Sequence, residues 1–298
     1  MKAGVIGIGK LGSIHLRIYQ EIPGIKEVFI ADSNDSTLSS HTNITAFADY
    51  RQLLGKVDLV TVATPTNTHY EIAKFFLENK IPVLVEKPIT MDMTQARHLI
   101  ALAKKHKTLI CVGHVERYNN AYLAVKEMIH NPLFIECNRI SPFPNRSLDI
   151  SVVLDLMIHD LDIILYLLRS KVKRIEAKGV KVLSNSEDIA NARLTFTNGC
   201  VANITASRIS MKRERKLRIF MHNGYISIDY AEQQAAVYRK INNQITQEIL
   251  TIQKEEPLKK EIMDFVNMVR HGKFDSTGAQ KATEALNLAL IIQKKLRS

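Results

Sequence analysis

Residues 2–12 read KAGVIGIGKLG, a short apolar run that leads directly into the pattern GxGxxG at Gly7, Gly9 and Gly12. The run predicts a β-strand, and residues 14–20 predict the helix that follows it. In this setting Gly7 permits a tight turn, Gly9 lets the backbone approach a pyrophosphate, and Gly12 lets the helix pack close to the strand. The free N–H groups at the start of the helix then attract phosphates. The sequence therefore predicts a dinucleotide-binding βαβ unit of the Rossmann type.

Asp32 decides which dinucleotide this unit prefers. It lies twenty residues beyond Gly12, at the end of a second predicted strand, Val28–Ala31. A carboxylate at this place bonds to the ribose hydroxyls of NAD and repels the 2′-phosphate of NADP. Residues 31–37 read ADSNDST, which adds a second acid and contains no arginine. We predict that the cofactor is NAD.

Strands and helices continue to alternate up to about Tyr118, which is typical of a parallel sheet built from βαβ units. After Tyr118 the pattern changes to β-prone runs, two of which flank Asn198-Gly199 and Asn223-Gly224, the strongest short hairpin signal. Helices are predicted at 121–130, 152–168, 259–269 and 278–296. The predicted fold class is α/β. A Rossmann domain with a parallel sheet spans residues 1–118, and a C-terminal α+β domain with a large, mostly antiparallel sheet spans residues 119–298.

The composition of the chain argues against a membrane-spanning, a metal-binding or a nucleic-acid-binding protein. The chain has 298 residues, 46% of them hydrophobic and 24% charged, and its formal net charge is +11. The most apolar segment, 152–168, carries three aspartates, so no membrane span is predicted. The three cysteines show no metal-ligand spacing, so we expect reduced core residues, no metal, and a cytoplasmic protein. No nucleic-acid-binding motif accompanies the basic residues, and we expect an anionic small molecule rather than nucleic acid or a membrane as partner.

Three further segments carry candidate chemistry: ATPTNTH at 63–69, EKP at 86–88, and the pair Asp155 and His159 within the apolar helix. The first two follow predicted parallel strands, and ligands bind at the carboxyl ends of such strands. Asp155 and His159 are four residues apart, which puts them on one face of a helix. The alternative for His159 is a histidine that merely packs in the core, but the acid four residues before it favours catalysis.

Together with the glycine loop, these segments resemble the glucose-fructose oxidoreductase, inositol dehydrogenase and rhizopine catabolism (Gfo/Idh/MocA) family over almost the whole chain. The resemblance implies dimers or tetramers, and a sugar site lined by Lys87, Asp155 and His159 beside the nicotinamide. The chain departs from the family by lacking glycines around Asp155, so we expect a different local backbone there. The predicted cofactor-binding set comprises the glycine loop, the acid of the second strand and the two later segments: Gly7, Gly9, Lys10, Leu11, Gly12, Asp32, Thr64, Pro65, Asn67, His69, Glu86 and Lys87.

The residues themselves suggest the same chemistry. Oxidation of a secondary alcohol needs a hydride acceptor, which NAD supplies, and a base that titrates near neutrality. A histidine ordinarily has a pKa of about 6.5, so His159 suits this role, with Asp155 orienting it. Lys87 would polarise the substrate oxygen or share its proton. Although Lys87 and His159 lie in different predicted domains, we expect them to converge above the nicotinamide.

A narrower resemblance points to the substrate. The segment VGHVERYNNA at 112–121 and the loop PFPNR at 142–146 are similar to the UDP-N-acetylglucosamine 3-dehydrogenases of the family. Arg117, Tyr118 and Arg146 are therefore predicted to bind substrate together with Asp155 and His159, and Arg139 and Arg208 are weaker candidates to grip a diphosphate. The resulting hypothesis is oxidation at C3 of a UDP-N-acetylhexosamine. The alternatives are a dehydrogenase of a free sugar, an inositol or a UDP-uronic acid sugar, and a non-catalytic NAD-binding regulator.

Overall fold

The computed structural model describes residues 1–143 and 150–296, which divide into two compact units. The first unit consists of Met1–His114 and Leu258–Thr283, and the second of Val115–Pro257 and the residues from Glu284 onward. The division at His114 lies close to the predicted boundary after residue 118. A single cut does not describe the chain, however, because residues 258–283 return to the first unit.

The first unit contains a six-stranded parallel sheet with the order β3-β2-β1-β4-β5-β6. Between β1 and β4 the direction of winding reverses, and dinucleotides bind at this switch point in open sheets. The predicted Rossmann sheet is confirmed. Its strands are β1 (Lys2–Ile6), β2 (Glu27–Ala31), β3 (Ala46–Phe47), β4 (Leu59–Val62), β5 (Val83–Glu86) and β6 (Ile110–Gly113).

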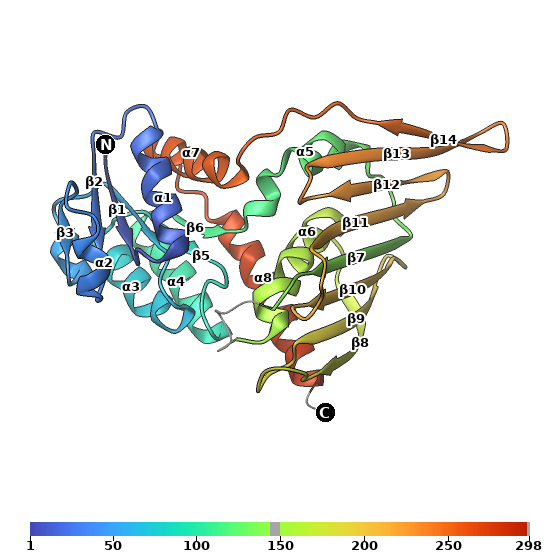
Figure 1. The fold of residues 1–298 in the computed structure, drawn as a ribbon, viewed down its shortest axis with the longest axis horizontal. Helices are drawn as coiled ribbons and strands as arrows, with labels where there is room; N and C mark the ends of the chain where they lie inside the picture. The colour runs from blue at the N-terminus through green and yellow to red at the C-terminus, as the bar shows by residue number, and fades with distance from the viewer. Residues whose placement is uncertain (144–149, 297–298) are drawn as a thin grey trace. The chain divides into compact units, whose positions relative to one another are not determined.

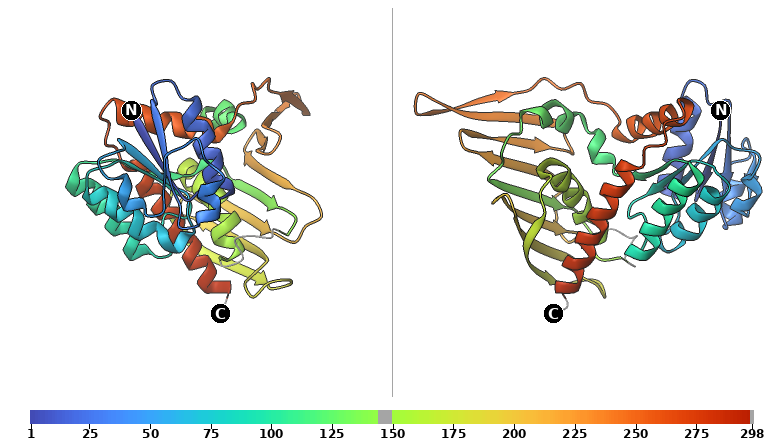
Figure 2. Two further views of the ribbon diagram at one scale, coloured as in Figure 1. Left: turned by 60° about the vertical axis from the view of Figure 1, so that its left-hand side comes forward. Right: turned by 180° about the vertical axis from the view of Figure 1, so that it is seen from behind.

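Helices cover both faces of this sheet (Figures 1 and 2). On one face lie α1 (Lys10–Glu21) and α7 (Pro257–Arg270), and on the other lie α3 (Thr66–Glu78) and α4 (Met93–His106). Tyr19 of α1 and Phe265 of α7 are buried in one hydrophobic cluster with Val5 of β1. This shared apolar burial explains why α7 joins the first unit from far along the chain.

A short helix, a short strand and the 3₁₀ turn Tyr50–Leu53 of the first unit were not predicted, and α1 and α3 each begin four residues earlier than predicted. The short helix α2 (Asp35–Ser39) and strand β3 have few residues, so they give little periodic signal. Helix α3 begins at Thr66 instead of Tyr70, which places most of the TPTNTH segment in its first turn. Thr68 donates its hydroxyl to the carbonyl of Pro65 at 2.8 Å, a side-chain bond that stabilises a helix start which threonine propensity alone does not indicate.

The second unit is built on an eight-stranded sheet with the order β14-β13-β12-β11-β7-β10-β9-β8. Its pairs are antiparallel except β7 with β10, which confirms the predicted large, mostly antiparallel sheet. Both Asn-Gly pairs lie at hairpin turns, as predicted. The strands are β7 (Phe134–Ile140), β8 (Val172–Val180), β9 (Ile189–Phe196), β10 (Val201–Ser207), β11 (Glu214–Met221), β12 (Gly224–Asp229), β13 (Gln234–Ile241) and β14 (Gln244–Ile249).

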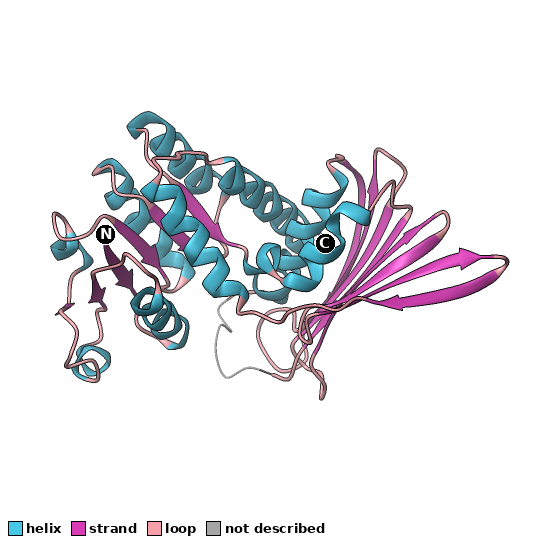
Figure 3. Ribbon diagram, turned by 90° about the horizontal axis from the view of Figure 1, so that it is seen from above, coloured by secondary structure: helices cyan, strands magenta, loops and turns pink. Residues whose placement is uncertain are grey.

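Helices of the second unit lie against one face of this sheet (Figure 3). They are α5 (Asn120–Val125), α6 (Ile158–Leu168) and the later part of α8 (Thr277–Leu296). The predicted helix 121–130 is shorter in the structure, because α5 ends at Val125 and a 3₁₀ turn follows. Within the residues that the structure describes, no helix is long and apolar enough to cross a membrane.

Candidate active site

The glycine loop follows β1 and opens α1, and each glycine has a distinct environment. A Cβ on Gly7 would lie 2.8 Å from the carbonyl oxygen of Ala63, and Gly7 has a φ of +85°, which glycine adopts without strain. A Cβ on Gly12 would lie 1.7 Å from the carbonyl oxygen of Gly7, so only glycine lets α1 start so close to the strand. A Cβ on Gly9 would meet no atom within 4 Å, which leaves room for a pyrophosphate against the backbone. The environments of Gly7 and Gly12 match the turn and the close packing predicted for them, whereas the contact of Gly9 with a pyrophosphate stays a prediction.

Helix α1 presents its amide groups at this loop. Gly9 occupies its N-cap position and has no side chain with which to cap it. The N–H groups of the first turn, at Lys10, Leu11 and Gly12, therefore have no partner within the helix, which is the arrangement that binds phosphates elsewhere.

Asp32 follows β2 and does more than the sequence predicted. Its Oδ2 accepts a hydrogen bond from the backbone N–H of Ile8 at 2.7 Å, and its Oδ1 accepts one from Asn34 at 2.9 Å. The carboxylate thus fixes the glycine loop, and Asp32 remains partly exposed. Each carboxylate oxygen has a second lone pair, which leaves capacity for the ribose hydroxyls of NAD.

Glu86 and Lys87 stand at the carboxyl end of β5. Lys87 is partly exposed, whereas Glu86 is buried with its Oε1 2.9 Å from Nε2 of His15. Burial would raise the pKa of Glu86, but the hydrogen bond and charge of His15, together with the charge of Lys87, lower it overall. The Glu86 carboxylate is therefore bound to the protein instead of being presented to a ligand, a role that we did not predict.

His69 connects two segments of the predicted site. It is 1% exposed, with its Nδ1 2.9 Å from the carbonyl oxygen of Pro88 and its Nε2 2.9 Å from that of Thr64. Burial lowers the pKa of His69, and the hydrogen bonds to the carbonyls of Thr64 and Pro88 oppose this shift. His69 thereby ties the EKP segment to the loop after β4.

Asp155 and His159 lie where the backbone leaves the ordinary α-helix. Residues Val153–Met157 form a π-helical turn that leads into α6, so the prediction of one continuous α-helix from 152 to 168 was wrong. Single π turns within helices are frequent at functional sites. Asp155 and His159 are partly exposed, whereas most of their neighbours in this turn are buried.

Two arginines clamp α6 to the residues that follow the first unit. Arg117 donates to both oxygens of Asp162, with its Nε 2.7 Å from Oδ2. Arg139 donates to both oxygens of Asp160 at 2.9 and 3.0 Å, and also to Oε1 of Glu116 at 2.8 Å. Arg139 is 2% exposed, and bidentate pairs of this kind fix orientation as well as distance. The clamps hold the helix that bears His159.

These contacts correct two of the weaker candidates. Arg139 and Arg208 were considered for gripping a diphosphate, but both are buried in internal ion pairs, Arg208 with Asp188 at 3.0 Å. The aspartates in the otherwise apolar segment 152–168 could have indicated internal ion pairs, since buried charges are almost always paired. Arg117, which was predicted to bind substrate, is partly exposed and makes a bidentate pair with Asp162. Arg146, which was also predicted to bind substrate, lies outside the described residues.

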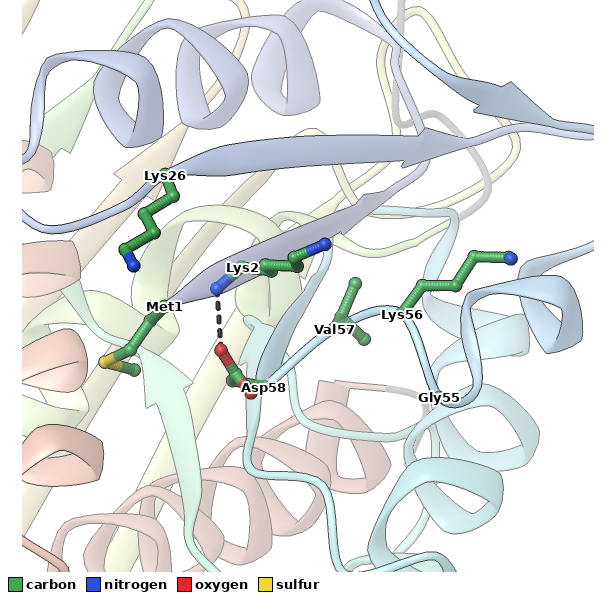
Figure 4. A pocket seen from close by; sticks show the side chains of 7 residues that line it. All are labelled: Met1, Lys2, Lys26, Gly55, Lys56, Val57 and Asp58. Carbon is green, nitrogen blue, oxygen red and sulfur yellow. Dashed lines mark hydrogen bonds between the residues drawn. The ribbon is translucent and has the colours of Figure 1, made fainter.

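A hollow of about 420 Å³ lies at the amino-terminal ends of the strands of the Rossmann sheet (Figure 4). It is lined by residues before or at the starts of β1, β2 and β4, among them Lys2, Lys26 and Asp58, whereas the glycine loop follows the end of β1. Ligands of such sheets bind at the carboxyl ends of the strands, so this hollow is not the cofactor site. Among the described residues, no group of three or more His, Cys, Asp or Glu side chains could hold a metal ion.

Comparisons with known proteins place the chain. The family described as "Oxidoreductase family, NAD-binding Rossmann fold" matches residues 1–114, and "GFO/IDH/MocA C-terminal domain" matches residues 135–227. UDP-N-acetylglucosamine 3-dehydrogenase from Acidithiobacillus ferrooxidans is 33% identical over 277 residues, which cover 90% of this chain and 88% of that protein. The chain belongs to the Gfo/Idh/MocA oxidoreductase family. Residues 1–114 of this family member form its NAD-binding domain.

Similarity within the Gfo/Idh/MocA family extends to solved structures. The crystallised UDP-N-acetylglucosamine 3-dehydrogenase of A. ferrooxidans superposes with a TM-score of 0.92 at 32% identity, covering 99% of this chain and 97% of that one. Myo-inositol 2-dehydrogenase from Thermotoga maritima is 25% identical, covering 99% and 96%. The resemblance predicted from the motifs is confirmed, whereas the roles of the individual site residues stay predictions. Lys87 belongs to the first unit and Asp155 and His159 to the second.

Proposed function

We propose that this protein is an NAD-dependent dehydrogenase that oxidises the C3 hydroxyl of a UDP-N-acetylhexosamine to a keto sugar. The observation that carries the proposal is the full-length similarity to the A. ferrooxidans UDP-N-acetylglucosamine 3-dehydrogenase, at 33% identity. The net charge of +11 favours an anionic substrate such as a nucleotide sugar.

In this proposal His159 takes the proton of the reacting hydroxyl, and bound NAD would accept the hydride from the carbon that bears this hydroxyl. Asp155 orients the imidazole and stabilises its protonated form. Lys87 polarises the substrate oxygen, and Tyr118 and Arg146 contact the remainder of the substrate. The clamp on Asp162 leaves Arg117 a role in positioning as well as in contact. Bound NAD supplies the hydride acceptor, and the protein supplies orientation and proton transfer.

Substrate comparison tests this proposal. With NAD present, UDP-N-acetylglucosamine should give a kcat/KM at least about 10²-fold above that of free N-acetylglucosamine, because binding energy from the remote diphosphate orients the reacting carbon. Formation of NADH, followed by absorbance, measures both rates. Comparable values would favour the second candidate, a free-sugar or inositol dehydrogenase, to which the similarity with T. maritima myo-inositol 2-dehydrogenase also points. No turnover of any sugar would favour a regulator.

Cofactor choice gives a second prediction. The dissociation constant for NAD should be at least tenfold lower than that for NADP, a difference of about 1.4 kcal/mol. The physical reason is the Asp32 carboxylate, which would repel the 2′-phosphate. Titration calorimetry with each dinucleotide checks this, and equal or tighter binding of NADP contradicts it. Asp32→Ala should weaken NAD as well, because Asp32 also holds the amide of Ile8.

We further propose that the open face of the eight-stranded sheet joins two copies of the chain. The alternating apolar residues of β11 do not mark this face, because Leu217 and Ile219 are buried on the side that the helices cover. On the other face, cross-strand pairing aligns a row of partly exposed aromatic rings that ends in a stacked pair of tyrosines. The row consists of Phe134, Phe220, Tyr225 and Tyr238, with Tyr225 and Tyr238 4.2 Å apart between ring centroids.

Charge placed in this row should disrupt the assembly. The double substitution Tyr225→Lys and Tyr238→Lys should convert a dimer or tetramer into a monomer, because it would bury two cations in an apolar interface. Light scattering after size-exclusion chromatography measures the mass. Met211→Lys, at a residue that is 96% exposed on the turn before β11, serves as the control and should leave the mass unchanged. A wild-type chain that is a monomer at working concentration contradicts the proposal.

A further inference from the structure

A buried histidine on α1 contacts the residue that precedes Lys87. His15 is fully buried, three residues beyond Gly12, and its Nε2 lies 2.9 Å from Oε1 of Glu86. The side chain of Glu86 is 10% exposed. The pair therefore joins the helix that starts at the glycine loop to the end of β5.

The structure also fixes the second oxygen of Glu86. Oε2 accepts a hydrogen bond from the backbone N–H of Lys87 at 3.3 Å. The carboxylate fills space that a side chain would otherwise take: a Cβ on Gly113 in the neighbouring strand β6 would lie 2.8 Å from Oε2. Both oxygens are thus held, one by His15 and the other by the backbone of Lys87.

Stability alone does not account for a histidine at this position. Within the described residues, the buried Nδ1 of His15 has no hydrogen-bond partner, and a buried polar atom without a partner costs free energy. A well-packed apolar pair of similar volume is often as stable as a buried polar pair or more so. The specific feature that the pair provides is the placement of Glu86, and through it the backbone of Lys87.

We propose that His15 is a positioning residue for Lys87, acting through Glu86. The chain of contacts runs from α1 through the carboxylate to the Lys87 amide, so the start of the Lys87 side chain is set relative to the glycine loop that would hold the pyrophosphate. This inference rests on the proposed role of Lys87 in the reaction. Groups that orient a reacting residue in this way typically change the activity by 10–100-fold when they are removed.

Three variants of α1 test the inference. His15→Leu should lower kcat by roughly 10–100-fold while the KM for the UDP-sugar and the dissociation constant for NAD change by less than about threefold. His15→Gln, whose amide can still donate to Glu86, should recover most of kcat. Tyr19→Phe is the matched control, because it removes another buried hydrogen bond of α1, from Tyr19 to Thr61 at 2.7 Å, without touching Glu86. Tyr19→Phe should retain kcat although its melting temperature falls by about as much as that of His15→Leu.

A second readout does not depend on the substrate. After reductive ¹³C-methylation, the NMR signal of Lys87, assigned by its loss in Lys87→Arg, should shift in His15→Leu and stay in place in Tyr19→Phe. This measurement separates a failure of the inference from a failure of the proposed function, which turnover of the wild type reports. If His15→Leu does not fold, His15→Asn, whose amide is too short to reach Glu86, takes its place. Three results would each overturn the inference. The first is a Lys87 signal that does not move in His15→Leu, and the second is an equal loss of kcat in Tyr19→Phe. The third is a loss of NAD affinity that matches the loss of kcat.

Discussion

His159→Ala should lower kcat by roughly 10²–10⁴-fold, the usual contribution of a positioned general base. The affinity for NAD should hardly change, because the predicted contacts of the cofactor's phosphates and adenosine lie in residues 1–114, whereas His159 belongs to the second unit. Stopped-flow formation of NADH at saturating UDP-sugar measures the step. A His159→Ala enzyme with normal turnover would falsify the assignment.

Lys87→Ala should cause a loss of the same order, since Lys87 is expected to act on the same oxygen. If both groups serve one proton transfer, the double variant should lose far less than the product of the two single losses. Multiplicative losses would mean that the two residues act in separate steps. Lys10→Ala is the matched control: Lys10 is an exposed lysine of the glycine loop, so its loss should raise the dissociation constant for NAD and leave kcat nearly unchanged.

Asp155→Asn distinguishes two roles of this carboxylate. If it only orients and charges the imidazole, kcat falls by less than in His159→Ala and KM stays constant. If it also holds a substrate hydroxyl, KM rises as well. The pH profile of kcat should move to lower pH in Asp155→Asn, because the protonated imidazole loses its counter-charge and deprotonates more readily.

The Rossmann half was predictable because its signals are local. The spacing of three glycines and the acid twenty residues on predict a loop, a helix start and a strand end, and the structure places each of them there. Helix α7 was assigned to the wrong half of the chain by position, since amphipathic periodicity indicates that a helix has a buried face but not which sheet covers it. Strands β8, β13 and β14 were also not located individually from the sequence. Strand β14 is exposed throughout, so it lacks the alternation that marks a half-buried strand.

In the candidate site, too, local features could be predicted from the sequence and long-range contacts could not. The residue types at Lys87, Asp155 and His159 indicate chemistry by themselves, whereas the contacts of His15, Glu116 and Asp160 depend on pairings between residues far apart in the chain. The π turn at Val153–Met157 was equally hidden, because the side-chain pattern of a π turn differs little from that of an α-helix over five residues. Charged residues in apolar segments were the available signal, since they must find partners once buried.

The buried pair of Arg139 with Asp160 supplies the second large expected effect. Arg139→Met should lower the free energy of unfolding by about 3–5 kcal/mol, because it leaves the buried carboxylates of Asp160 and Glu116 without their shared cation. Arg17→Met is the control: Arg17 pairs with Glu21 on an exposed face of α1, with side chains 48% and 39% exposed, and such pairs contribute about 0–1 kcal/mol. Urea unfolding of both variants measures the difference.

The loss in Arg139→Met should depend on pH with a definite sign. Burial raises the pKa of Asp160 even with Arg139 present, and the charge of Arg139 opposes this rise. Removing Arg139 therefore raises the pKa further, so the folded variant binds a proton at a pH where the unfolded chain has released it. Stability of the variant then falls as pH rises from the unfolded pKa of an aspartate towards the higher folded value. The difference between variant and wild type should consequently be smaller at pH 5 than at pH 7.5. A difference that is constant across this range, or that grows towards acid, would show that Asp160 is not the group left unpaired.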